Sequence, residues 1–243
     1  MRSASLRDHV DSPSQTQAPN AFSLDVIAEL AKHDVFMSNL LRRLTVTTYD
    51  EFLSVLYDDI KLVIERIEEN PQDFPDEPED ATTKRIADIL WGMQYTASHN
   101  LAAGGNVDLT VAIARLNFKW IAEAKRFGSV TDMREGYLQL STRYKPGMGS
   151  NGTLYGGMIG YLRRSDAAAH MGSWRKALLT VPGAETSVLA DCARRYALGF
   201  QSEHKHKDFG VPLRVWHNCV VLTFEPQDKS GRTAKRYRKA ASE

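Results

Sequence analysis

Three charged side chains stand inside otherwise apolar segments, and their chemical types suit catalysis. Asp108 begins the apolar segment 107–114, and Glu123 and Lys125 lie inside the segment 118–127. If both segments are β-strands, side chains alternate between the two faces, so Glu123 and Lys125 share one face. The sequence therefore predicts a carboxylate and an ammonium group presented together.

The two carboxylates predict a binding site for a divalent cation. If the two segments pair as a hairpin, Asp108 reaches the site of Glu123, and two carboxylates with nearby carbonyls suit an oxygen-preferring cation. We expect Mg²⁺, or Mn²⁺, at these two residues. The cation would lower the pKa of a bound water and stabilise charge on a phosphodiester, while Lys125 orients the water or balances the developing charge. The opposing interpretation is a solvated ion pair of Glu123 and Lys125, with Asp108 merely ending a turn.

The surrounding segments alternate between strand and helix patterns. Asp132 stands where a helix N-cap is expected, the polar run 98–105 should end a helix, and the pattern of 188–198 is unclear. This order of elements predicts an α/β fold in which helices flank a mixed central sheet. The predicted strands are 107–114, 118–127, 154–162 and 211–224, and the predicted helices are 82–93, 132–144 and 165–179.

The chain divides into four regions by composition. Residues 1–22 are polar and predict a flexible arm, and 23–70 predict an N-terminal helical extension that packs on the core or docks a partner. A proline-rich, acidic linker leads into the main α/β domain, 82–226. The basic segment 227–243 predicts a flexible tail.

Composition excludes several classes of protein. The 243 residues carry a formal charge of +1, so no global field attracts polyanions and nucleic-acid contacts must come from local patches. Cys192 and Cys219 are too few for a disulfide framework and are expected to be small core residues. No segment has the length of a membrane span or the apolar core of a secretory signal, so a cytoplasmic protein without membrane contact is expected.

Several short motifs resemble those of the PD-(D/E)XK nuclease superfamily, which has the restriction-endonuclease-like fold. The matching residues are Gly105 to Leu109, then Glu123-Ala124-Lys125, then Gln139 in the following helix. In that family a tyrosine often follows the glutamine by four residues, whereas here Arg143 has that spacing and Tyr144 comes one later. The resemblance covers about residues 82–180.

Two other positions of the family pattern are less clear. Many members have proline before the first aspartate, where this chain has Val107. A further acidic residue often comes from the preceding helix, and Asp88, Glu79 and Asp80 all remain candidates.

The resemblance implies a Mg²⁺-dependent nuclease with catalytic residues Asp108, Glu123, Lys125 and Gln139. Such enzymes hydrolyse DNA or RNA, and DNA is the preferred substrate in this interpretation. The family serves in restriction, in repair and in bacterial defence against phage, and a defence effector is a natural setting.

Basic residues around the motifs predict the nucleic-acid contacts, interleaved with tyrosines that could stack on bases. They are Arg126, Arg143, Lys145, Arg163 and Arg164. A scatter of solvated charges is the alternative.

His204, His206 and His217 allow a metal site, but a polar loop with solvated histidines is the preferred interpretation, because no third ligand has a recognisable spacing. Two other functions stay open: a non-catalytic nucleic-acid-binding or assembly subunit, and a protein that only mediates protein contacts. A protein partner or a homo-oligomer is also expected.

Overall fold

The computed structural model describes residues 24–74, 77–102 and 106–228. The predicted arm (1–22), Gly105 and most of the predicted tail (229–243) lie outside the described residues. The chain divides into two compact units at Ser38 and Asn39. The first unit contains helix α1 (Leu24–Ala31) and the first turn of α2 (Val35–Thr45), and the second contains all the other elements.

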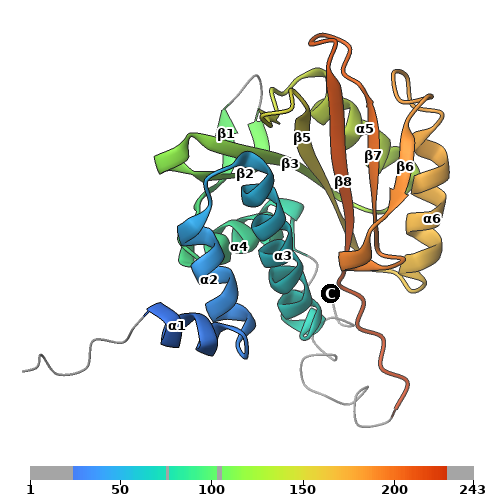
Figure 1. The fold of residues 1–243 in the computed structure, drawn as a ribbon. Helices are drawn as coiled ribbons and strands as arrows, with labels where there is room; N and C mark the ends of the chain where they lie inside the picture. The colour runs from blue at the N-terminus through green and yellow to red at the C-terminus, as the bar shows by residue number, and fades with distance from the viewer. Residues whose placement is uncertain (1–23, 75–76, 103–105, 229–243) are drawn as a thin grey trace, which may run out of the picture. The chain divides into compact units, whose positions relative to one another are not determined.

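The second unit is built on one mixed eight-stranded sheet (Figure 1). Its strand order is β1-β2-β3-β5-β8-β7-β6, and the short β4 pairs with β5. The three central strands β3, β5 and β8 are parallel, and the outer strands on both sides are antiparallel. The strands are β1 (Thr96–Ala102), β2 (Asn106–Ile113), β3 (Phe118–Arg126), β4 (Gly147–Met148), β5 (Leu154–Leu162), β6 (Val188–Asp191), β7 (Gly199–Lys205) and β8 (Pro212–Val221).

Helices cover the two faces of this sheet with two separate cores. On one face α3 (Tyr49–Glu68) and α4 (Glu79–Gly92) pack on a core that includes Trp120 and Trp216. On the other face α5 (Val130–Thr142) and α6 (Ala167–Leu178) pack on a core that includes Met158. The α/β class with a mixed sheet between helices is therefore confirmed. Three short 3-10 helices complete the fold: η1 (Pro71–Asp73), η2 (Ala114–Leu116) and η3 (Ala193–Arg195).

Local chemistry explains where the two helices nearest the predicted site begin. Ser129 caps α5 in a capping box with Asp132, so Asp132 is the third helical residue rather than the predicted N-cap. Helix α4 begins at Glu79, earlier than the predicted start at 82, because Pro78 precedes a first turn that carries two acids. The predicted linker therefore ends inside α4.

Strand β5 is the centre of the sheet and matches its predicted span. All nine of its residues are buried, as expected for a strand covered on both faces. Gly157 is needed there, because a Cβ atom would lie 2.2 Å from the Trp120 ring. Both cysteines are free and buried, as predicted.

Four strands were not predicted: β1, the two-residue β4, β6 in the segment whose pattern was unclear, and β7. The polar run 98–105 was expected only to end a helix, but its described part belongs to β1, whose pairing with β2 satisfies the backbone without an apolar sequence. The histidine-containing segment was expected to be a loop, but His204 lies in β7. Helix α3, assigned to an N-terminal extension by the sequence, lies in the same unit as the sheet and shares a core with it.

Within the described residues, no helix is long and apolar enough to cross a membrane.

Candidate active site

The ladder between β2 and β3 ends at Leu109 and Ala122, and the two strands separate beyond this pair. Continued by one residue, the same register would place Asp108 opposite Glu123, with both side chains on the α5 side of the sheet. Asp108 Oδ2 accepts a hydrogen bond of 2.9 Å from the Ala124 amide, which β2 no longer pairs. Where the strands diverge, the Asp108 carboxylate is therefore the hydrogen-bond acceptor of this β3 amide, in place of a backbone carbonyl of β2.

A second carboxylate reaches the same edge of β3 from helix α4. Glu79 Oε2 accepts a hydrogen bond of 2.8 Å from the Arg126 amide. Asp108 and Glu79 thus satisfy successive outward-facing amides of β3. Of the three acids that the sequence left open, Glu79 is the one that comes to the site, because Asp88 pairs with Lys84 and Asp80 approaches His99.

Lys125 lies between three carboxylates. Its Nζ atom is 2.5 Å from Glu123 Oε1 and 3.6 Å from both Asp108 Oδ2 and Glu79 Oε1. The structure thus brings Asp108, Glu123 and Lys125 together, as the strand pattern predicted. With Glu79 they form a group of four residues that we call the acid–lysine cluster.

The Glu123 carboxyl group is the most buried member of the cluster. Its side chain is 1% exposed, and Oε2 has no hydrogen-bond partner within the described chain. Burial, followed by repulsion from Asp108, raises the pKa of Glu123 to about 7, although Lys125 acts in the opposite direction. This carboxyl group is therefore held near the midpoint of its titration at neutral pH.

The Lys125 ammonium group responds in the opposite way to the same surroundings. Burial lowers its pKa, but the hydrogen bond and charge of Glu123, helped by Asp108 and Glu79, outweigh burial and raise it. Lys125 is thus held as a cation among the three acids.

Tyr144 closes the cluster at the end of α5. Its hydroxyl donates a 2.7 Å hydrogen bond to the Asn106 carbonyl and also interacts with Glu123. Burial, then the charges of Glu123 and Asp108, raise the pKa of Tyr144 to about 12, so it stays a donor. In the sequence, Arg143 occupies the position four residues after Gln139 where the family often has a tyrosine. In the structure, Tyr144 is the residue that interacts with the carboxylates.

Helix α5 approaches the cluster at Gly136. A Cβ atom there would lie 2.7 Å from Lys125 Cγ and 3.2 Å from Glu123 Cγ, so only glycine allows this approach. Gln139 follows one turn later, and its amide oxygen is buried without a hydrogen-bond partner in the described chain. Within the described residues, no hydrogen bond joins the Gln139 side chain to the acid–lysine cluster.

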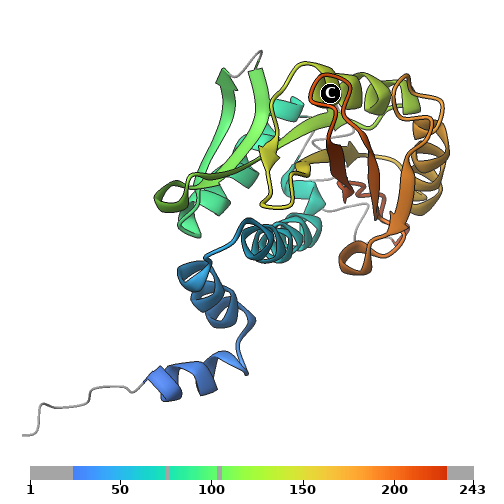
Figure 2. The same cartoon turned by 45° about the horizontal axis from the view of Figure 1, so that its top comes forward.

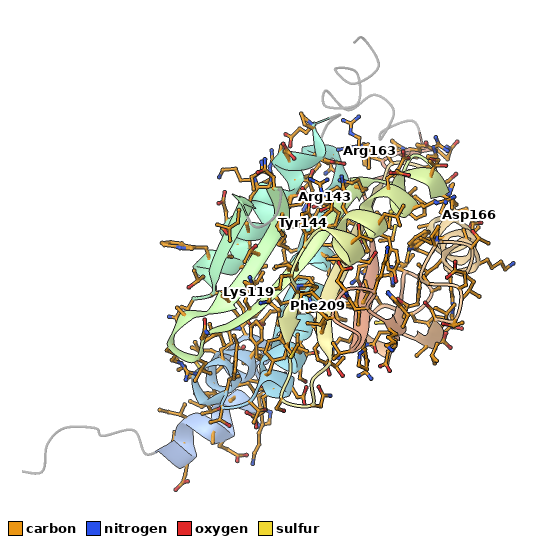
Figure 3. The ribbon with its side chains drawn as sticks, turned by 90° about the horizontal axis from the view of Figure 1, so that it is seen from above. Lys119, Arg143, Tyr144, Arg163, Asp166 and Phe209 are labelled. Atoms are coloured by element: carbon orange, nitrogen blue, oxygen red, sulfur yellow. The ribbon has the colours of Figure 1, made fainter. Side chains whose placement is uncertain are left out.

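The predicted nucleic-acid contacts fall into two groups. Arg126 and Arg163 donate to the backbone carbonyls of Glu77 and Phe74, so they fix the segment before α4. Arg143, Lys145 and Arg164 are exposed. Figure 3 labels Arg143 next to Tyr144, consistent with the 5.8 Å between the guanidinium carbon and the centroid of that ring.

The three histidines are buried, which corrects the expected solvated loop. His204 is hydrogen-bonded to Tyr137 at 2.8 Å. His217 Nδ1 accepts from the Trp174 indole, so its neutral ring carries the proton on Nε2 and donates to Ser202. An imidazole that donates to a serine cannot activate it as a nucleophile. The register pairs His217 with Phe200 and His204 with Leu213, which separates the histidines along the sheet.

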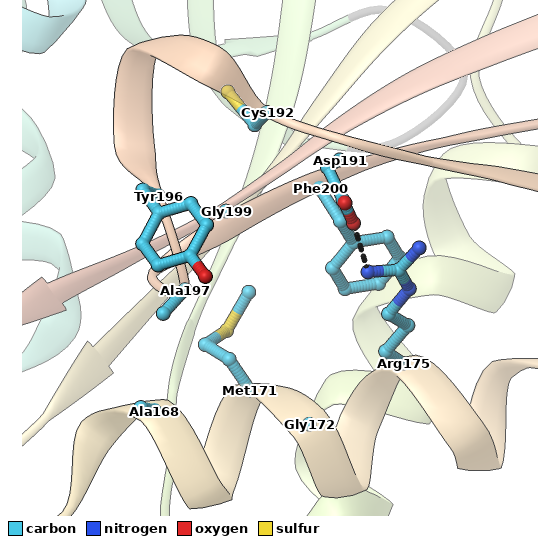
Figure 4. A pocket seen from close by; sticks show the side chains of 10 residues that line it. All are labelled: Ala168, Met171, Gly172, Arg175, Asp191, Cys192, Tyr196, Ala197, Gly199 and Phe200. Carbon is cyan, nitrogen blue, oxygen red and sulfur yellow. Dashed lines mark hydrogen bonds and ion pairs between the residues drawn. The ribbon is translucent and has the colours of Figure 1, made fainter.

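A hollow near the opposite edge of the sheet is distinct from the cluster, although α5 and α6 cover the same face. It lies between α6 and the residues around β6, with the Arg175–Asp191 ion pair on one side, Tyr196 on the other and Met171 between them (Figure 4). Because β6 is the strand farthest from β1, this hollow and the acid–lysine cluster lie toward opposite edges of the sheet.

Three functional residues were not identified from the sequence. Glu79 remained one of three candidates, Tyr144 was displaced by one residue from the expected spacing, and Gly136 was not considered. A glycine in mid-helix shortly after the Glu-x-Lys strand is the signal that could have found the approach of α5.

Within the described residues, no three His, Cys, Asp or Glu side chains form a group that could hold a metal ion by themselves.

Comparisons with protein-family models, curated proteins and solved structures found no match.

Proposed function

We propose that the protein is a Mg²⁺-dependent nuclease that hydrolyses phosphodiester bonds of DNA, or of RNA, at the acid–lysine cluster. The observation that carries this proposal is the buried Glu123–Lys125 pair, joined by Asp108 and Glu79 where β2 and β3 diverge. Burying an ion pair usually costs as much free energy as the attraction returns. A buried pair of this kind beside further carboxylates supports a chemical role for these side chains.

The carboxylates fit a divalent cation. Mg²⁺ typically keeps several waters and takes only one or two protein carboxylates, so a third ligand of this chain is not required. Asp108 and Glu123 would hold it, and the unpartnered Glu123 Oε2 is an available ligand atom. When bound, the cation would lower the pKa of a water and stabilise negative charge on the phosphodiester.

The remaining residues have separate roles in this mechanism. Lys125 balances the developing negative charge and orients the attacking water through its ammonium protons. The Tyr144 hydroxyl, whose proton is donated to the Asn106 carbonyl, lowers the pKa of Glu123, and Gln139 orients the site from α5. Glu79 holds the end of β3 in place through the Arg126 amide.

The proposed family and biological setting rest on resemblance. An acid-x-Lys strand inside a mixed sheet between helices resembles the PD-(D/E)XK enzymes. A bacterial restriction or phage-defence effector, working with a protein partner or as a homo-oligomer, is the corresponding setting.

Cleavage assays test the proposal directly. Purified protein is incubated with supercoiled plasmid and with labelled single-stranded DNA and RNA, in Mg²⁺, Mn²⁺ or EDTA. We expect metal-dependent cleavage that falls about 100-fold or more in Lys125→Ala. Lys84→Ala is the matched control, because Lys84 forms an exposed ion pair on α4 away from the cluster.

A non-catalytic nucleic-acid-binding or assembly subunit is the second candidate. It is favoured by the backbone-capping roles of Asp108 and Glu79, which give these acids a purely structural use. Binding without cleavage in any metal, unchanged in Lys125→Ala, would establish this second function and exclude the nuclease.

A further inference from the structure

One face of strands β1 and β2 is not covered by a helix in the described chain. Helix α4 packs on these strands from one side, and α5, on the other side, packs on β3 and β5. Figure 2 shows the green β1–β2 pair extending beyond the yellow-green α5. Thr96 and Ser98 point to this open face, because Ala97, between them, packs in the core beneath α4. Thr96 is exposed there, and Ser98 is half-buried.

The strand register arranges the side chains of this face in rows beside the acid–lysine cluster. The nearest row is Ser98, Thr110 and Ile121, and the next is Thr96, Ala112 and Lys119. Lys119 is four residues from Glu123 on β3, which is about 13 Å at the usual rise of a strand. Thr110 and Ile121 in the nearest row are buried, at 4% and 1% exposure, so the accessible polar side chains of these two rows are Ser98, Thr96 and Lys119.

Two cations beside this face indicate an anionic partner. Lys119 and Arg143 have no hydrogen bond or ion pair from their side chains to any described residue, and Arg143 only approaches the Tyr144 ring. Figure 3 labels Lys119 on β3 and Arg143 just after α5.

The Arg and Lys side chains of α2, α3 and α4, by contrast, all pair with carboxylates: Arg42, Arg43, Lys61, Arg66, Lys84 and Arg85. Unpaired cations beside an exposed, polar edge strand suit successive phosphates of one nucleic-acid strand.

We propose that a single, unpaired nucleic-acid strand lies across the open face of β1–β2, with its phosphates bound by Lys119 and Arg143. This inference rests on the proposed nuclease function and names its substrate as single-stranded. The cluster is recessed, since the Asp108 side chain is 12% exposed and Glu123 only 1%. A flexible strand can lower one phosphate into such a recess, whereas a stiff duplex cannot bend locally at small cost.

Binding measured without cleavage tests this surface. Fluorescence anisotropy in EDTA compares a labelled DNA strand of about 20 nucleotides with the same strand in a duplex. We expect tighter binding of the single strand, and a loss of roughly 3- to 10-fold in affinity for Lys119→Ala and for Arg143→Ala. Each variant should also reduce the slope of log K against log salt by about 0.7, the value for one phosphate of a single strand.

Lys176→Ala is the matched control, because Lys176 is an exposed lysine on α6, which lies toward the edge of the sheet opposite to β1 and β2. Tighter binding of the duplex, or wild-type affinity in the Lys119→Ala/Arg143→Ala double variant, would overturn the proposal.

The two proposals fail in different ways. If the protein cleaves nucleic acid but its affinity is unchanged in the Lys119 and Arg143 variants, only the proposed binding surface is excluded. If the affinity depends on both residues but no cleavage occurs in any metal, only the proposed nuclease activity is excluded.

Discussion

At the scale of single residues, Glu123 determines how the site responds to pH. Its folded-state pKa of about 7 lies above the ordinary value of 4.5, so the folded protein holds this proton more tightly than the unfolded chain. The corresponding stabilisation is complete below pH 4.5 and is lost as pH rises through 7. The ionised carboxylate that the proposed metal binding requires is therefore obtained at a cost in stability.

Glu123→Gln tests this linkage. We expect the free energy of unfolding of the wild type, relative to this variant, to fall by roughly 1–2 kcal/mol between pH 5.5 and pH 8. Denaturant unfolding at both pH values measures it, and taking the difference cancels the groups common to both proteins. A constant difference would show that Glu123 titrates normally.

Tyr144→Phe should move the pH dependence of cleavage. The hydroxyl lowers the pKa of Glu123, so its removal raises that pKa further. If the nuclease proposal holds, the acidic limb of the rate profile shifts to higher pH, while the rate on its plateau changes less. An unshifted limb, with the variant folded, would mean that Glu123 does not control the rate.

The residues of the cluster were predictable because alternation along a strand depends only on the backbone. Glu123 and Lys125 share a face whatever surrounds them, and Asp108 joins them once the hairpin forms. Glu79 was not predictable in the same way. Its position depends on how α4 packs on β1 and β2, which no local pattern encodes.

At the scale of elements, the fit of α5 over the cluster depends on one glycine. In Gly136→Ala the added methyl group would displace Lys125 or lift the helix. We expect a loss of about 1–3 kcal/mol in stability and, if the enzyme assignment holds, about 100-fold in cleavage rate.

Gly172→Ala on α6 is the matched control, because nothing lies within 4 Å of its added methyl group. It should gain up to about 1 kcal/mol from helix propensity alone. Thermal unfolding and cleavage rates of both variants decide the matter, and equal effects of the two substitutions would contradict a specific role for Gly136.

Strands were predictable from the sequence where their buried positions carry apolar residues. Strand β5 was predicted because its sequence is apolar and uncharged, and all of its residues are buried in the structure. Strand β7 was missed because two of its inward-facing residues are Ser202 and His204, whose polarity hides the alternation. Strand β1 lies at the edge of the sheet and exposes polar side chains on one face, so its sequence has the composition of a turn.

At the scale of the whole molecule, three buried histidines connect stability to acid. Burial lowers the pKa of His204, His206 and His217, and that of His217 falls to about 3. Unfolded histidines bind protons near pH 6.5, so the stabilisation is present above that pH and is lost as pH falls toward the folded pKa.

We expect His217 alone to account for about 2 kcal/mol of lost stability between pH 7 and pH 5. The stability advantage of the wild type over His217→Gln should shrink by that amount in this range. His33→Gln, at an exposed position, is the control. An advantage that stays constant down to pH 5 would show that His217 takes up a proton in the folded state.

The central position of β5 also has a consequence during synthesis on the ribosome. One side of β5 can pair with β3 as soon as it is made, but the other side waits for β8, about fifty residues later. A product released before Pro212 therefore presents a fully apolar strand as a bare sheet edge, which is a template for aggregation. We expect a chain ending at residue 205 to sediment with the insoluble fraction while the full chain stays in solution, and a soluble, monomeric truncated chain would refute this.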